Sequence, residues 1–140
     1  MSESPFWFEQ ALQTPSEPGS VVVEGVNIVY ETWGKPGNPG AVLIHGSNAH
    51  LEWWRFTAPF LADKLHIAAL DLSGNGNSDW REKYRGEDFA KEVMAVAEAS
   101  SMNKNPFIVG HSFGGFVALE TCYRYQNDVG GLLLMDFTTA

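Results

Sequence analysis

The chain has 140 residues, a formal net charge of −8, and contents of 44% hydrophobic and 19% charged residues. This length allows one domain with a core, and the composition is typical of a globular protein. The acidic balance, with no basic cluster, argues against nucleic acid and anionic membrane surfaces as partners. A single cysteine, Cys122, excludes an internal disulfide. Because no secretory signal or membrane-spanning apolar run is present, we expect a cytoplasmic protein with no membrane partner.

Residues 1–20 are predicted to be an N-terminal extension, and residues 21–140 to be the core domain. The extension is punctuated by Pro and Ser and holds one aromatic patch, Phe6-Trp7-Phe8. We expect this patch to lie on the body of the domain, with docking of a partner as the alternative.

Strands and helices alternate along the rest of the chain. The hydrophobic patterns predict strands at residues 21–24, 27–33, 41–44, 67–72, 107–109 and 131–136, and helices at residues 51–65, 87–102 and 116–125. A turn at Gly25 joins the first two strands into an antiparallel hairpin. The later alternation implies parallel βαβ units with right-handed crossovers. The predicted fold class is therefore α/β, a mostly parallel twisted sheet with helices on both faces.

The helix predicted at residues 51–65 contains Pro59, which indicates a kink or a break into two pieces. The spacing of its large apolar side chains predicts one core-facing side, made of Trp53, Phe56, Phe60 and Leu61.

A G-x-S-x-G motif follows the apolar strand at residues 107–109. The motif runs from Gly110 to Gly114, and a helical pattern comes after it. A tight turn between a strand and a helix is the context in which this motif forms a nucleophile elbow. The two glycines are needed because strand and helix leave no room for side chains. We therefore predict that Ser112 is a catalytic nucleophile at the positively polarised start of a helix.

Three motifs, each at a strand end, resemble those in the N-terminal half of an α/β-hydrolase. They are residues 42–47, residues 70–79 and residues 110–115. The resemblance implies the N-terminal strands of an α/β-hydrolase core, with the C-terminal part absent. It also implies that the backbone N–H groups of Ser47 and Phe113 form the oxyanion hole. The segment at Asp71 resembles the family's D-x-x-G-x-G-x-S loop, which is usually structural.

Three further residues are weaker candidates for the site. Asn48 either orients substrate or stabilises its loop. Trp53 and Trp54 point about 100° apart on a helix, so we expect one in the core and assign Trp54 to the substrate pocket. Asp136 ends a strand after the nucleophile, where some family members place the triad acid. Since more members place it one strand later, a turn role for Asp136 is the alternative.

A serine hydroxyl needs an adjacent base, and the resemblance implies a histidine downstream of the nucleophile. The four histidines, His45, His50, His66 and His111, all precede Ser112. We expect His45 to brace the oxyanion loop and His111 to be structural. The base is then expected from sequence outside this chain, either a missing C-terminal half or a second chain.

The sequence thus predicts a serine hydrolase acting on a small, largely apolar carboxylic ester or related acyl substrate. The alternative is a catalytically inactive binding or interaction module of the same fold. No metal site is predicted from the His and Cys spacing, and no cofactor is expected, since the Gly74-x-Gly76 segment lacks a third glycine and a helix start. We expect further polypeptide or another copy of the chain to cover the apolar strand at residues 132–135.

Overall fold

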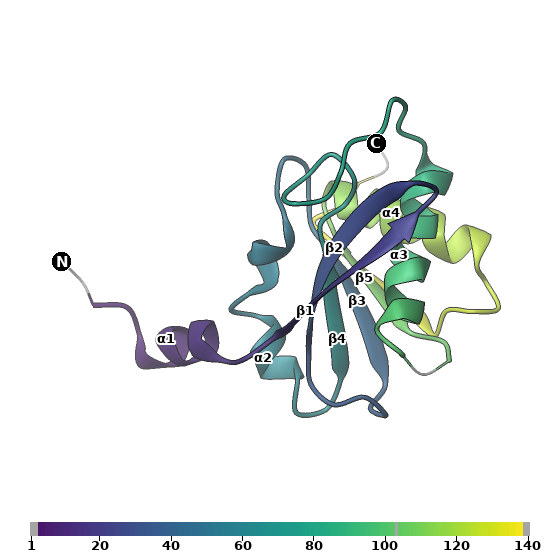
Figure 1. Cartoon of the computed structure of the whole chain (residues 1–140). Coiled ribbons are helices and arrows are strands. Elements are labelled where there is room, and N and C mark those ends of the chain that lie inside the picture. Colours follow the sequence, from purple (N-terminus) through teal and green to yellow (C-terminus); the bar gives the residue numbers. More distant parts are fainter. Residues whose placement is uncertain (1–2, 103, 139–140) are drawn as a thin grey trace.

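A computed structural model of the chain describes residues 3–102 and 104–138 (Figure 1). In these residues six strands form one sheet in the order β1-β2-β4-β3-β5-β6. The strands are β1 (Glu17–Val23), β2 (Val26–Trp33), β3 (Gly40–Ile44), β4 (His66–Leu70), β5 (Phe107–His111) and β6 (Gly131–Met135). The helices are α1 (Phe6–Gln13), the 3-10 helix η1 (Leu51–Trp54), α2 (Ala58–Leu61), α3 (Gly86–Ala99) and α4 (Phe113–Arg124).

The sheet is antiparallel at one side and parallel over the rest. β1 and β2 form the predicted hairpin, in which Val23 pairs with Val26 across Glu24 and Gly25. Both turn residues have positive φ values, 50° and 81°, as a two-residue hairpin turn that follows the twist of the strands requires. β2 pairs antiparallel with β4, whereas β4, β3, β5 and β6 run parallel. The predicted α/β class and mostly parallel sheet are confirmed.

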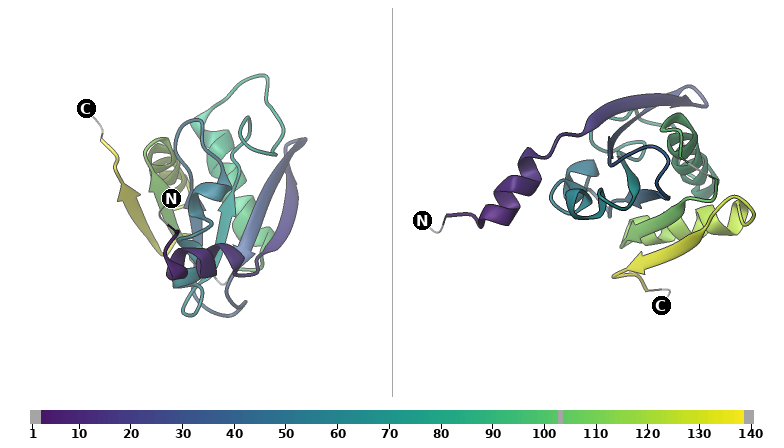
Figure 2. Two further views of the ribbon diagram at one scale, coloured as in Figure 1. Left: turned by 90° about the vertical axis from the view of Figure 1, so that its left-hand side faces the viewer. Right: turned by 90° about the horizontal axis from the view of Figure 1, so that it is seen from below.

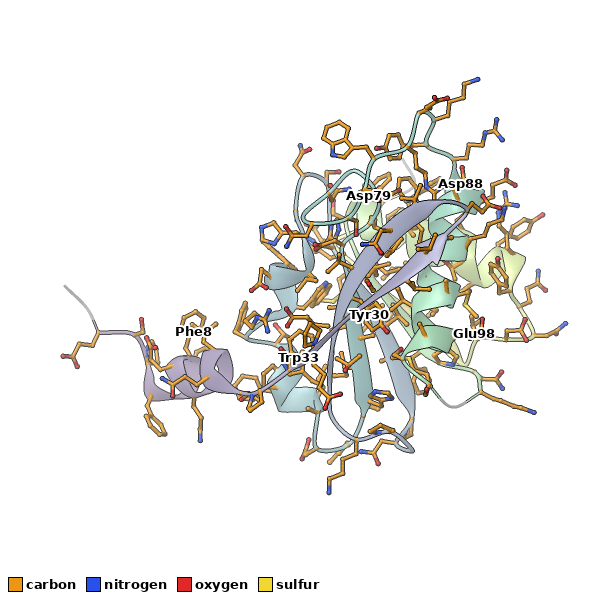
Figure 3. The ribbon with its side chains drawn as sticks, in the orientation of Figure 1. Phe8, Tyr30, Trp33, Asp79, Asp88 and Glu98 are labelled. Carbon is orange, nitrogen blue, oxygen red and sulfur yellow. The ribbon has the colours of Figure 1, made fainter. Side chains whose placement is uncertain are left out.

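Helices cover both faces of this sheet (Figure 2). Val42 and Ile44 of β3 belong to the core beneath α3 and α4, while Leu43 belongs to a second core beneath η1 and α2. β2 divides in the same way, with Tyr30 in the first core and Trp33 in the second (Figure 3). Because both faces are covered, every residue of β3 and β4 is buried, which explains why His66 is the one polar residue in these two strands.

The helix predicted at residues 51–65 is broken, as Pro59 indicated, into η1 and α2. Pro59 lies in the first turn of α2, where its missing N–H is not needed. The predicted core-facing side is wrong: its four large side chains, Trp53, Phe56, Phe60 and Leu61, are 38–57% exposed. Leu51, Trp54 and Ala58 are buried instead. The break changes the angular phase of the two pieces, so a single helical period does not describe them.

The N-terminal extension carries α1, which projects away from the sheet in Figure 1. β1 begins at Glu17, within the predicted extension. Two of the three rings of the aromatic patch lie on the domain as predicted. Trp7 contacts Phe60 at a centroid distance of 5.9 Å, and Phe8 contacts Phe56 at 5.6 Å. Residues 1 and 2 lie outside the described part of the chain.

β6 is the outer strand on the parallel side of the sheet. Its four large apolar side chains, Leu132, Leu133, Leu134 and Met135, are 37–55% exposed. An apolar groove of about 470 Å³ lies between β6 and α2, with Leu61, Phe107 and Leu133 among its lining residues. None of the helices in residues 3–102 and 104–138 has the length and apolar character needed to cross a membrane.

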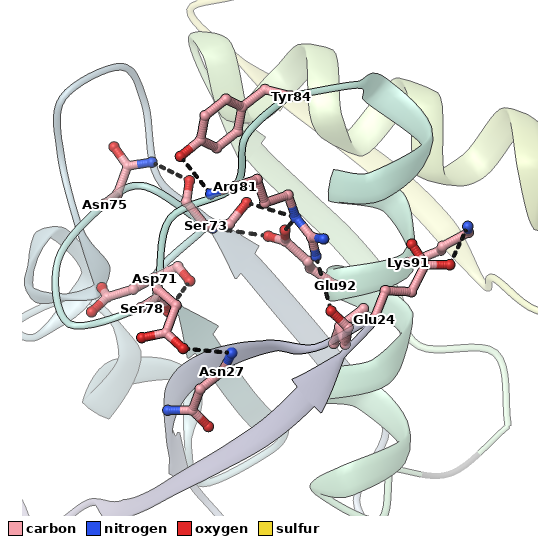
Figure 4. A network of polar contacts seen from close by, with 12 residues as sticks. Glu24, Asn27, Asp71, Ser73, Asn75, Ser78, Arg81, Tyr84, Lys91 and Glu92 are labelled. Carbon is pink, nitrogen blue, oxygen red and sulfur yellow. Dashed lines mark hydrogen bonds and ion pairs between the residues drawn. The ribbon is translucent and has the colours of Figure 1, made fainter.

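A buried ion pair ties α3 to the loop that follows β4 (Figure 4). Nε of Arg81 donates to Oε1 of Glu92 at 2.9 Å, and the two side chains are 8% and 0% exposed. The other carboxylate oxygen of Glu92 accepts a hydrogen bond from the N–H of Ser73 at 2.9 Å. Arg81 also donates to the carbonyl oxygen of Val23 at the end of β1. The pair therefore joins three parts of the chain, and no local sequence pattern predicts it.

Candidate active site

Ser112 lies between β5 and α4 with a strained backbone. Its φ of 52° and ψ of −119° fall in a region that side-chain-bearing residues rarely adopt, at a cost of about 1–3 kcal/mol. Its N–H donates to the carbonyl oxygen of Met135 at 2.9 Å, and its carbonyl oxygen accepts from the N–H of Gly115 at 2.8 Å. These bonds, one to β6 and one within the first turn of α4, fix the turn between β5 and α4. The Ser112 side chain remains partly exposed.

The two glycines of the motif are required by close backbone approach. A Cβ at Gly110 would overlap the carbonyl oxygen of Gly114, and a Cβ at Gly114 would overlap that of Ile44. Helix α4 begins at Phe113, three residues before the predicted start. The N–H of Phe113 is therefore in the first turn, where helical N–H groups have no intrahelical acceptor. An oxyanion donor needs such a group.

The loop after β3 packs directly against the elbow. A Cβ at Gly46 would lie 3.1 Å from Nδ1 of His111 and 3.3 Å from Cβ of Ser112. Ser47 and Asn48 follow and are exposed. Asn48 has a φ of 54°, and its short polar side chain makes this left-handed conformation accessible. The two predicted oxyanion donors, Ser47 and Phe113, thus belong to segments on either side of Ser112.

The buried ring of His45 joins this loop to the segment that follows β4. The N–H of Leu72 donates to Nε2 of His45 at 3.1 Å, so Nδ1 carries the ring proton and donates to the carbonyl oxygen of Gly46 at 2.8 Å. The His45 side chain is fully buried. Burial, the largest effect, lowers the pKa of His45 below its usual value. The contacts fit the predicted bracing role, and they require the neutral ring.

This burial predicts a loss of stability in acid. Since the pKa of His45 is lowered on folding, the unfolded chain binds the proton first as the pH falls. The contribution of His45 is therefore complete above about pH 6.5, its unfolded pKa, and is lost as the pH falls toward the folded pKa. We expect His45→Gln to make the decline in unfolding free energy below that pH shallower, as measured by urea denaturation across the pH range.

Burial also lowers the pKa of His66, so a decline from that residue should remain in the His45→Gln variant. An unchanged pH profile in His45→Gln would show that His45 is not neutral and buried in solution.

The Asp71 loop has a structural role, as the resemblance implied. Oδ1 of Asp71 accepts from the N–H of Leu51 at 2.7 Å, and Oδ2 accepts from the N–H of Asn77 at 2.8 Å. The hydroxyl of Ser78 donates to the carbonyl oxygen of Asp71 and accepts from the N–H of Val29. The buried carboxylate thereby fixes the start of η1 relative to the end of β4.

The positions of the two tryptophans are exchanged relative to the prediction. Trp54, assigned to the substrate pocket, is 3% exposed and packs in the second core with Trp33. Trp53 is 52% exposed and stacks on His111, with 5.1 Å between ring centroids and 18° between ring planes. Trp53 is therefore the tryptophan beside the elbow. A prediction based on one continuous helix could not give this arrangement, because the helix is broken between η1 and α2.

Asp136 follows β6 with a φ of 50°, which suits an aspartate in a turn. Its side chain is 90% exposed, and Oδ2 lies 3.9 Å from Nε2 of His111. The described residues show no hydrogen bond between the Ser112 hydroxyl and any imidazole. Three grooves on the surface of the described residues are lined by other side chains, and Ser112 lines none of the three.

The sequence model of the family described as "alpha/beta hydrolase fold" matches residues 42–138. The chain belongs to the alpha/beta hydrolase family. The matched range includes β3, the Asp71 loop, the elbow and β6, which confirms the resemblance drawn from the three motifs. This hydrolase-family chain is also 36% identical over 104 residues to the "uncharacterized hydrolase YugF" of Bacillus subtilis, covering 73% of this chain and 38% of that protein.

Solved structures agree on the fold. A putative lipase from Acinetobacter baumannii superposes with a TM-score of 0.80 at 24% identity, covering 98% of this chain and 48% of its own. A membrane phospholipase A superposes with a TM-score of 0.82 at 30% identity, covering 94% of this chain and 42% of its own. The alpha/beta hydrolase chain thus spans less than half the length of each of these relatives.

Proposed function

We propose that this chain is the nucleophile-bearing part of a serine hydrolase that acts on a small, largely apolar carboxylic ester or related acyl substrate. Oγ of Ser112 attacks the carbonyl carbon, and its proton passes to a histidine supplied by sequence outside these 140 residues. The oxyanion accepts hydrogen bonds from the N–H groups of Ser47 and Phe113. Departure of the alcohol leaves an acyl group on Ser112, which water then hydrolyses.

The observation that carries the proposal is the backbone of Ser112. A turn residue with no function would be glycine at φ 52° and ψ −119°, because glycine adopts this conformation without strain. Strain of this kind concentrates at active sites, where the surrounding structure imposes it. Here the bond to Met135 and the glycine contacts impose it. The start of the 12-residue helix α4 adds partial positive charge where negative charge would develop.

The proposal extends to the exposed side of β6. An open apolar strand edge beside an apolar groove is an arrangement that folded proteins avoid. The length of the relatives supports further polypeptide as the covering partner, since the matched parts are only 38–48% of those chains. The same polypeptide would supply the base histidine and complete the acyl pocket.

Labelling of the complete polypeptide by a fluorophosphonate probe tests the proposal. We expect the probe to modify Ser112, identified by mass spectrometry of the tryptic peptides, and to leave Ser112→Ala unlabelled. Ser20→Ala is the matched control, because Ser20 is exposed on β1, away from the elbow. Labelling should persist in that variant. A complete protein whose Ser112 stays unmodified would favour the alternative, a binding module that keeps the fold without the chemistry.

A further inference from the structure

The ring of His111 lies beside side chains from two other segments of the chain. His111 ends β5, directly before Ser112. One ring face stacks on Trp53 of η1, with 5.1 Å between centroids. Nε2 lies 3.9 Å from the carboxylate of Asp136, which follows β6. The imidazole is thus confined between η1 and the end of β6.

The remaining edge of the ring meets the oxyanion loop. Nδ1 of His111 is buried, with no hydrogen-bond partner among the described residues. It lies 3.1 Å from the position that a Cβ on Gly46 would occupy. A buried polar atom without a partner is unfavourable, so Nδ1 does not hold the ring in place. The stacking on Trp53 is therefore the contact that holds the ring, since the exposed carboxylate of Asp136 lies beyond hydrogen-bond distance.

Gly46 consequently lies between the side chains of two histidines, His45 and His111. From beneath, His45 donates to its carbonyl oxygen at 2.8 Å. On the side of the elbow, the space that a side chain at Gly46 would need is bordered by Nδ1 of His111 and Cβ of Ser112. The next residue is Ser47, whose N–H is the proposed oxyanion donor. An oxyanion donor must lie within about 2.7–3.1 Å of the developing charge, so a small shift of this loop removes its effect.

We propose that His111, held by Trp53, is a positioning residue that sets the Gly46–Ser47 loop against the nucleophile. This inference rests on the proposed function of Ser112 and Ser47. It assigns His111 no proton transfer, since no hydrogen bond joins its ring to the Ser112 hydroxyl in the described part of the chain. Trp53 acts through His111.

The test compares single variants of the complete polypeptide with p-nitrophenyl butyrate as substrate. We expect His111→Ala and Trp53→Ala to lower kcat by about 10–100-fold, less than full loss of an oxyanion donor, with KM changed by no more than about 3-fold. Trp53→Phe keeps an aromatic face and should restore most of kcat. His50→Ala, a substitution at an exposed loop histidine, is the control and should match the wild type.

An alkylboronic acid provides a readout that general destabilisation would not move. It forms a tetrahedral adduct with the serine and occupies the oxyanion hole, so its inhibition constant should rise in parallel with the loss of kcat/KM. A double-mutant cycle with Gly46→Ala adds a direct test of contact. The new methyl group would press on Nδ1 of His111, so its effect on kcat should be smaller in the His111→Ala background.

Wild-type kcat and boronate affinity in a folded His111→Ala protein would overturn the inference, as would full additivity with Gly46→Ala. If His111→Ala does not fold, Trp53→Ala decides the matter, because half of that indole is already exposed. The two proposals fail differently. An inactive Ser112→Ala with a fully active His111→Ala refutes only the positioning role, whereas an active Ser112→Ala refutes the serine mechanism itself.

Discussion

Replacing Ser112 by alanine is expected to lower kcat/KM for ester hydrolysis by about 10⁴–10⁶-fold in the complete polypeptide. The hydroxyl is the group that would form the bond to the acyl carbon, and the proposed oxyanion donors alone would provide only a residual rate. Steady-state hydrolysis of p-nitrophenyl butyrate measures this loss. An alanine variant that retains the wild-type rate would mean that another group performs the reaction, or that none on this chain does.

Glycine at the same position separates chemistry from strain. Ser112→Gly should be as inactive as Ser112→Ala but more stable than it by about 1–2 kcal/mol, because only glycine adopts φ 52° and ψ −119° freely. Urea denaturation of the two variants measures the difference. Equal stabilities would show that the turn is relaxed in solution and that Ser112 carries no backbone strain.

Removal of Glu92 is expected to cause the largest loss of stability. Glu92→Ala leaves the guanidinium of Arg81, which is 8% exposed, without its counter-charge, and it removes the acceptor of the Ser73 N–H. Breaking a buried ion pair from one side typically costs about 3–5 kcal/mol. Chemical denaturation measures the change. A cost below about 1 kcal/mol would place the pair in water rather than in the interior.

Two controls sharpen this expectation. Lys91 lies on the same helix and pairs with Glu24 at 2.7 Å on the surface, so Lys91→Ala should have a much smaller effect than Glu92→Ala. The double variant Arg81→Met/Glu92→Met removes both charges together. It should recover much of the stability lost in Glu92→Ala, because most of that loss comes from the uncompensated charge.

Local sequence signals predicted the parts of the fold that have local causes. Gly110 and Gly114 are required by backbone contacts within and beside one turn, so the motif alone located the elbow. The Glu24-Gly25 turn and the unbroken apolar run of β3 likewise indicate a hairpin and a strand buried on both faces. The order of the motifs then identified the family.

The features that the sequence analysis missed depend on contacts between distant segments. Trp53 and Trp54 are adjacent in sequence, and only the break after η1 decides which one reaches His111. Arg81 and Glu92 lie on a loop and a helix with no spacing rule that links them. The packing of His111 beside Gly46 brings together two residues that are separated by 64 others in the sequence. No pattern within either segment predicts it.

The central position of β3 has a consequence for synthesis on the ribosome. Val42 must pair with Ile108, which is made 66 residues later, because β5 occupies the side of β3 that β4 leaves open. At roughly 5–20 residues per second, the nascent chain would hold this apolar strand unpaired on one side for roughly 3–13 s. The yield of folded protein should therefore depend on codon choice and chaperone supply during that interval. These factors should affect the yield more than the stability of the folded protein does.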